Sequence, residues 1–252
     1  FAHIKHLFIS HLHGDHFYGL PGLISTFRLL GREAPLYIYG PKGITDAITL
    51  LLKLANYWTN YPLHFHELTE KSSVCLLSED EIEVHTIPLK HRVYTNGFLF
   101  RETPKDRKIN AETVEEYQID QSQMRNLKEG KDVVNTQGRT IASQELTYDP
   151  RPPKSYAFCS DTAYHPEMID QIEQVDVLYH EATFLNDHQE LAQKTFHSTA
   201  QQAAQIAKDA HVKHLILGHY SSRYKDLTQF QSEAAEIFPH VDLAYDGYSL
   251  EF

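Results

Sequence analysis

Cysteine, methionine and tryptophan are scarce in this sequence, and long apolar runs are absent. The 252 residues include two cysteines, two methionines and one tryptophan. Cys75 and Cys159 lie far apart and form neither a disulfide framework nor a repeated Cys-x-x-Cys zinc pattern, which indicates a reducing compartment. No apolar run approaches the length needed to span a bilayer, and no secretory signal is evident. We therefore expect a cytoplasmic protein with no membrane partner.

Positive charge is also in short supply. Lysine and arginine total 23 against 34 aspartates and glutamates, which gives a formal net charge of −11. Such a balance argues against undirected nucleic-acid binding, because affinity for phosphates is usually built from clustered basic side chains. Bound metal ions would nevertheless make a site locally positive.

The pattern of apolar residues predicts one α/β domain over residues 1–252. Strands are expected at Lys5–Ile9, Leu36–Tyr39, Ile82–Pro88, Gly97–Arg101, Ser155–Cys159, Val175–Tyr179, His214–Leu217 and Asp242–Glu251. One helix should carry an apolar stripe of Leu23, Ile24, Phe27 and Leu30, and others are expected at Gly43–Tyr57, Thr199–Ala210, with Ser198 as N-cap, and Thr228–Phe238.

Residues 103–153 depart from this layout, since they are polar, rich in charge and poor in apolar periodicity. A long insertion in a compact domain tends to be functional or disordered, so this segment is interpreted as an inserted arm. Its lysines and arginines would meet phosphates, or its acidic neighbours offset them and the surface is merely solvated.

The run of six residues that directly follows the first apolar strand, residues 11–16, carries the strongest chemical signal. His11, His13, Asp15 and His16 follow one another at the end of that strand. Imidazole and carboxylate ligands suit zinc and similar metals, and burying them unpaired would be costly. Since residues two apart share a face of an extended segment, His11 and His13 are expected on one ion and Asp15 and His16 on a second.

Three further residues follow apolar strands and would complete a two-metal centre. They are His91, Asp161 and His219, and the carboxylate of Asp161 could bridge both ions. This order of ligands resembles the metallo-β-lactamase fold superfamily, which implies a four-layer αββα sandwich. The match extends to the runs Phe17–Leu23, His180–Thr183, His197–Thr199 and Ser222–Tyr224, a combination that resembles the ribonuclease Z family of tRNA 3′-processing endonucleases.

The resemblance implies two zinc ions per subunit, with manganese or another divalent metal as alternatives. It assigns His11, His13 and His91 to one ion, Asp15, His16 and His219 to the other, and Asp161 to both. Asp15 would also act as general base, and His197, oriented by Glu181, would assist departure of the 3′ oxygen. Arg223, Ser198 and Thr199 would bind substrate, and His180 is interpreted as structural. The implied partners are precursor tRNA and a second subunit, whose arm would hold the substrate.

The sequence also departs from the family. Ser160 stands where the family usually has glycine and Ser222 where alanine is common, and both replacements are small. The arm reads Glu116–Gln123 where a Gly-Pro-rich tip is usual. The family's opening strands are not part of this sequence, which suggests a fragment. Two rival hypotheses remain: a metallohydrolase acting on small phosphodiesters or other esters, and a non-catalytic RNA-binding protein. Retention of every metal ligand disfavours the second.

Overall fold

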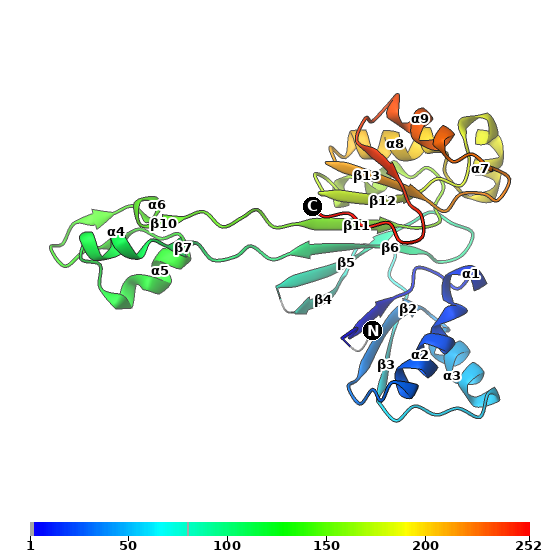
Figure 1. The fold of residues 1–252 in the computed structure, drawn as a ribbon, viewed down its shortest axis with the longest axis horizontal. Coiled ribbons are helices and arrows are strands. Elements are labelled where there is room, and N and C mark those ends of the chain that lie inside the picture. Colours follow the sequence, from blue (N-terminus) through cyan, green and yellow to red (C-terminus); the bar gives the residue numbers. More distant parts are fainter. Residues whose placement is uncertain (1–2, 80) are drawn as a thin grey trace. The chain divides into compact units, whose positions relative to one another are not determined.

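The computed structural model describes residues 3–79 and 81–252, and the chain divides into two compact units. Unit 1 contains residues 1–78, 83–100 and 155–252, and unit 2 contains residues 79–82 and 101–154. Figure 1 shows the elements of both. Unit 2 includes the segment interpreted above as an inserted arm.

One layer of unit 1 is a parallel sheet in the order β1-β2-β3. Its strands are β1 (His6–Phe8), β2 (Leu36–Pro41) and β3 (Leu63–Leu68), and the helices nearby are α1 (Gly14–Phe17), α2 (Gly19–Leu29) and α3 (Ile44–Leu54). Ile24, Phe27, Ile44 and Ile48 of α2 and α3 pack with Ile38 of β2, so these two helices cover one face of the sheet.

The second sheet of unit 1 has seven strands in the order β14-β13-β12-β11-β6-β5-β4. They are β4 (Cys75–Glu79), β5 (Ile82–Pro88), β6 (Asn96–Glu102), β11 (Ser155–Cys159), β12 (Val177–Glu181), β13 (His214–Gly218) and β14 (Val241–Leu243). The helices on this side are α7 (Gln189–Thr195), α8 (Ala200–Asp209) and α9 (Thr228–Ala235), with short 3₁₀ turns at Pro166–Gln171 and Asn186–His188.

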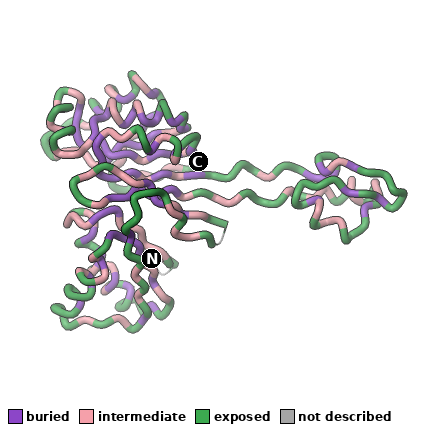
Figure 2. Tube along the Cα trace, turned by 180° about the vertical axis from the view of Figure 1, so that it is seen from behind, coloured by how far each residue is buried: buried purple, intermediate pink, exposed green. Residues whose placement is uncertain are grey.

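Aromatic side chains fill the space between the two sheets. The centroid of the Phe8 ring on β1 lies 5.3 Å from the ring centroid of Phe98 and 5.5 Å from that of Phe100, both on β6. On the outer side of the seven-stranded sheet, Ala203, Ile206 and Phe230 of α8 and α9 are fully buried. Figure 2 colours the chain by burial, with buried stretches in purple. Burial of these faces removes apolar surface from water on both sides of each sheet. The four-layer αββα sandwich is therefore confirmed.

Several predicted boundaries need correction. The predicted strand 242–251 ends at Leu243, and strands β3 and β4 were not predicted. In α2 the buried stripe is Leu20, Ile24 and Phe27, whereas Leu30 is 64% exposed. The N-cap of α8 is Thr199 rather than Ser198, because Thr199 and Gln202 form a reciprocal capping box.

Unit 2 has a small apolar core of its own, formed by Ile119, Leu127, Val133, Ile141 and Leu146. Its elements are β7 (Lys108–Ile109), α4 (Ala111–Glu116), the 3₁₀ turn Gln121–Gln123, α5 (Met124–Lys128), β8 (Val133–Val134), β9 (Thr140–Ile141), α6 (Ser143–Leu146) and β10 (Thr147–Tyr148). This segment is therefore folded although its apolar periodicity is weak, because its helices and strands are too short to show a repeat. In neither unit is any described helix long and apolar enough to cross a membrane.

Candidate metal centre

The loop between β1 and α1 gathers the first ligands. His11 is fully buried, and His13 is the last residue before α1. Gly14 starts that short helix, and a Cβ at this position would lie 2.3 Å from the ring of Tyr18, so glycine lets this ring pack against the turn. The helix then presents Asp15 and His16 one after the other. Local geometry thus separates the four polar side chains into two pairs.

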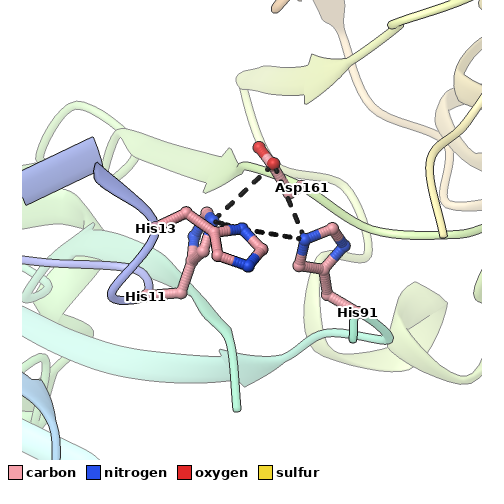
Figure 3. Close-up of side chains that lie close together, drawn as sticks. All are labelled: His11, His13, His91 and Asp161. Atoms are coloured by element: carbon pink, nitrogen blue, oxygen red, sulfur yellow. Dashed lines mark hydrogen bonds and ion pairs between the residues drawn. The ribbon is translucent and has the colours of Figure 1, made fainter. Parts of the chain in front are cut away.

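His11, His13 and His91 converge on one point (Figure 3). The Nδ1 atom of His13 lies 3.0 Å from Nε2 of His11 and 3.3 Å from Nε2 of His91. His91 comes from the loop that follows β5, so the residues meet only after folding. Three imidazole nitrogens this close suit a shared cation, because imidazole lone pairs repel one another without one.

Asp161 lies between this group and a second one. Its Oδ2 atom is 3.7 Å from Nε2 of His11 and 3.8 Å from Nε2 of His91. Its Oδ1 atom is 3.4 Å from Nε2 of His16 and 3.2 Å from Nε2 of His219. Each carboxylate oxygen therefore faces a different pair of imidazoles, which is the arrangement expected of a bridging ligand.

The second group consists of Asp15, His16 and His219. The exposed carboxylate of Asp15 lies 3.2 Å from Nε2 of His16 and 4.0 Å from Nε2 of His219. His219 adopts a left-handed backbone conformation with φ of 61°, which is unfavourable for a residue with a Cβ and is typical of functional sites. Gly218 before it is packed against Tyr179, whose hydroxyl oxygen would lie 2.2 Å from an added Cβ.

Three neighbours orient the imidazoles and were not assigned a role from the sequence. Nδ1 of His91 donates to the carbonyl of Phe196 at 2.9 Å, which leaves its Nε2 free to bind a metal. Nδ1 of His219 lies 2.9 Å from Oγ1 of Thr183, and Oγ of Ser10 lies 3.1 Å from Nδ1 of His11. The Phe196 contact carries no signal in the sequence, because a backbone carbonyl makes it.

The electrostatics of the centre fit a divalent cation. Burial lowers the pKa of His11 to about 3 and also lowers the pKa of His91, so both imidazoles stay neutral and able to donate a lone pair. Burial alone would raise the pKa of Asp161, but the surrounding histidines, His219 first, lower it overall. Nε2 of His16 is buried without a hydrogen-bond partner among the described residues. Neutral imidazole nitrogens, an ionised bridging carboxylate and a ring nitrogen without a hydrogen bond together form the kind of donor set that a divalent metal requires.

His197 lies against this centre and is fixed by Glu181. Its Nδ1 atom donates to Oε1 of Glu181 at 2.8 Å, and its ring stacks on His219 with centroids 5.5 Å apart. Burial by itself lowers the pKa of His197, but the hydrogen bond and charge of Glu181 outweigh this and raise it. Glu181 is fully buried, so it acts on His197 and does not face solvent.

The remaining predicted residues divide into exposed and buried ones. Arg223 is exposed, with its guanidinium 5.2 Å from the centre of the Phe184 ring. Ser198 and Thr199 are fully buried, and their side chains bond to the Thr162 carbonyl and the Gln202 amide. This burial corrects their assignment as substrate contacts, because both hydroxyls are used inside the fold. His180 is also fully buried, and its Nδ1 donates to the Glu181 carbonyl at 2.7 Å.

Comparison with known proteins gives consistent matches along the chain. A beta-lactamase superfamily domain model matches residues 128–220. Curated proteins named ribonuclease Z are similar along nearly the whole chain. The one from Bacteroides thetaiotaomicron is 44% identical over 247 residues, which cover 98% of this chain and 78% of the relative. The one from Parabacteroides distasonis is 44% identical over 250 residues, covering 99% and 82%.

Solved structures agree on the fold. The crystal structure of the short form of human tRNase Z matches with a TM-score of 0.65 and 24% sequence identity, over 96% of this chain and 77% of that one. At this identity the match bears on the fold alone.

Proposed function

The chain belongs to the ribonuclease Z family and acts in tRNA 3′ processing, and we propose that it hydrolyses the phosphodiester at the trailer junction of precursor tRNA with two divalent metal ions. The observation that carries this proposal is the carboxylate of Asp161, whose two oxygens each face a separate pair of imidazoles. His11, His13 and His91 would hold one ion, Asp15, His16 and His219 the other, and zinc is the metal that these ligands suit best.

Metal ions bound there would lower the pKa of a water molecule and offset the charge that develops on the phosphodiester. Asp15 is the exposed carboxylate of the centre, so it is placed to accept a proton from the attacking water. His197 is held through Nδ1 by Glu181, which leaves Nε2 to donate a proton to the departing 3′ oxygen. The water oxygen forms the new bond to phosphorus as the bond to the 3′ oxygen breaks, which leaves a 3′ hydroxyl on the tRNA.

Unit 2 would serve as the arm that grips precursor tRNA, and Arg223 would contact a backbone phosphate through its planar guanidinium. We propose that the protein acts in the cytoplasm, where tRNA precursors are found and where free cysteines such as Cys75 and Cys159 stay reduced.

We also propose that the chain acts as a homodimer, with a face of α2 and α3 as the contact. Helix α3 buries Ile44, Ile48 and Leu52. Three large apolar side chains nearby in the chain are nevertheless exposed: Leu54 is 74% exposed, Leu29 82% and Trp58 64%. Arg28 lies 4.8 Å over the Tyr57 ring, so the carboxyl ends of these helices are neighbours. A helix that is apolar around most of its circumference is normally buried in the assembled protein.

Sedimentation velocity tests the dimer. Leu54→Glu should shift the protein to monomer, whereas Val134→Glu, which alters an exposed aliphatic residue of unit 2, should leave the assembly unchanged. A dimer that tolerates Leu54→Glu would contradict the assigned face.

The test of the reaction is cleavage of an end-labelled precursor tRNA by the complete protein, with the product mapped to the nucleotide. We expect one cut directly after the last nucleotide of the mature tRNA, abolished by a chelator and restored by zinc. A protein that carries its metals and hydrolyses only a small chromogenic phosphodiester would instead support the small-ester hypothesis.

A further inference from the structure

A pocket of about 450 Å³ opens beside His197 and has no role in the mechanism above. His197, Phe196, Tyr164 and Lys90 line it, together with glutamines of α7 and α8. Its volume falls in the range of pockets that hold small organic groups, about 300–1,000 Å³. Since His197 contacts the metal centre through His91 and His219, whatever fills this pocket lies next to the reacting phosphate.

Phe196 is held in an unfavourable backbone conformation at the wall of this pocket. It ends α7 in the left-handed region, with φ of 61° and ψ of 46°, where a residue with a Cβ is sterically disfavoured and glycine is not. Its carbonyl orients His91, but any residue type could supply that carbonyl. No other aromatic ring stacks on Phe196 within the described part of the chain, so its ring presents a free apolar surface to the pocket.

The polar side chains of the pocket have unused hydrogen-bonding capacity. Gln189 and Gln193 are on α7, and neither side-chain amide has a hydrogen-bond partner among the described residues. Gln202 uses its Oε1 atom to accept from the Thr199 amide at 3.0 Å, which leaves its NH₂ group to the pocket. Side-chain amides both donate and accept, as do the edges of nucleobases, and Lys90 adds an exposed cation suited to a phosphate.

We propose that this pocket binds the nucleotide whose 3′ oxygen leaves, the last nucleotide that the mature tRNA keeps. The inference rests on the proposed function, because His197 is assigned there to that oxygen, and the attached nucleoside must then lie beside His197. Its base stacks on Phe196 and Tyr164, and the glutamine amides contact its edge. Aromatic rings stack on every base, so the pocket recognises a nucleotide more than a particular sequence.

A double-mutant cycle between protein and substrate tests this assignment. Phe196→Ala should lower kcat/KM for an intact precursor about tenfold or more, as expected for the loss of a stacked base. An abasic residue at the last retained position should lower kcat/KM of the wild-type protein to a similar degree. Combining the two should give no further loss, because both changes remove the same contact.

Because Phe196 also touches His91 through its backbone, Gln193→Ala serves as a second variant without that link. It should show the same coupling to the abasic position, with a smaller effect. Tyr245→Ala, which removes an exposed ring elsewhere in unit 1, is the matched control and should show no coupling. Metal content is measured alongside for every variant, and Phe196→Ala should keep it.

Additive losses would overturn the proposal, as would coupling to an abasic residue at the first trailer nucleotide instead. Loss of metal from Phe196→Ala, with no coupling in Gln193→Ala, would reduce Phe196 to a positioning residue for His91. Failure of the wild-type protein to cut the intact precursor would refute the proposed function itself, whereas normal cutting with additive losses would refute only the pocket.

Discussion

Replacing Glu181 by glutamine should separate the orienting role of this residue from its role in stability. The fully buried carboxylate accepts four hydrogen bonds, from the Thr162 amide at 3.0 Å, from Nδ1 of His197 at 2.8 Å, and from the amide and hydroxyl of Thr183 at 2.9 and 2.8 Å. In either orientation, the NH₂ group of glutamine would face one of the two backbone amides. One buried N–H donor therefore loses its acceptor.

An unsatisfied buried donor costs about 1–3 kcal/mol, and each kcal/mol lowers Tm by about 2–4 °C in a chain of this size. Activity should fall as well, because the neutral amide no longer supports a protonated His197. General acid catalysis by a histidine contributes about 10²–10⁴-fold, which sets the expected loss for His197→Ala and the upper limit for Glu181→Gln.

The assay is single-turnover cleavage of precursor tRNA by wild type, both single variants and the double variant, with Tm and metal content measured in parallel. If Glu181 acts through His197, adding Glu181→Gln to His197→Ala should cause no further loss of rate, while the decrease in Tm persists. Glu190→Gln, an exposed glutamate on α7, is the control. Rate losses that multiply in the double variant would refute the reasoning.

The remaining predictions concern the metals, the backbone and unit 2. Asp161→Asn should leave less than two equivalents of metal after dialysis, measured by mass spectrometry, because one oxygen of the bridge becomes an NH₂ donor; full retention would contradict a bridging role. Gly218→Ala should destabilise the fold by about 1–3 kcal/mol and reduce cleavage, since its Cβ would lie 2.2 Å from the Tyr179 hydroxyl oxygen; an unchanged denaturation midpoint would argue against that packing. Leu127→Ala should cost unit 2 about 2–5 kcal/mol and raise KM for precursor tRNA, while hydrolysis of a small phosphodiester stays constant; equal effects on both substrates would count against an arm function.

The sequence determined by itself the fold class and the residues that form the centre. Strand-end positions identified His91, Asp161 and His219, because apolar runs reveal strands and polar residues after them stand at a sheet edge. Strand β3 was not predicted because half of its six residues are His64, His66 and Glu67, so its apolar content is low. The core of unit 2 was not predicted because its elements span only a few residues each.

Only the tertiary structure decided how those residues meet and what supports them. The opposed oxygens of Asp161 and the carbonyl of Phe196 against His91 are contacts between segments far apart in the chain. It also moved Ser198 and Thr199 from substrate to interior, since their hydroxyls satisfy buried backbone groups. A sequence records which side chains are present, whereas burial and the direction of each lone pair depend on packing between distant segments.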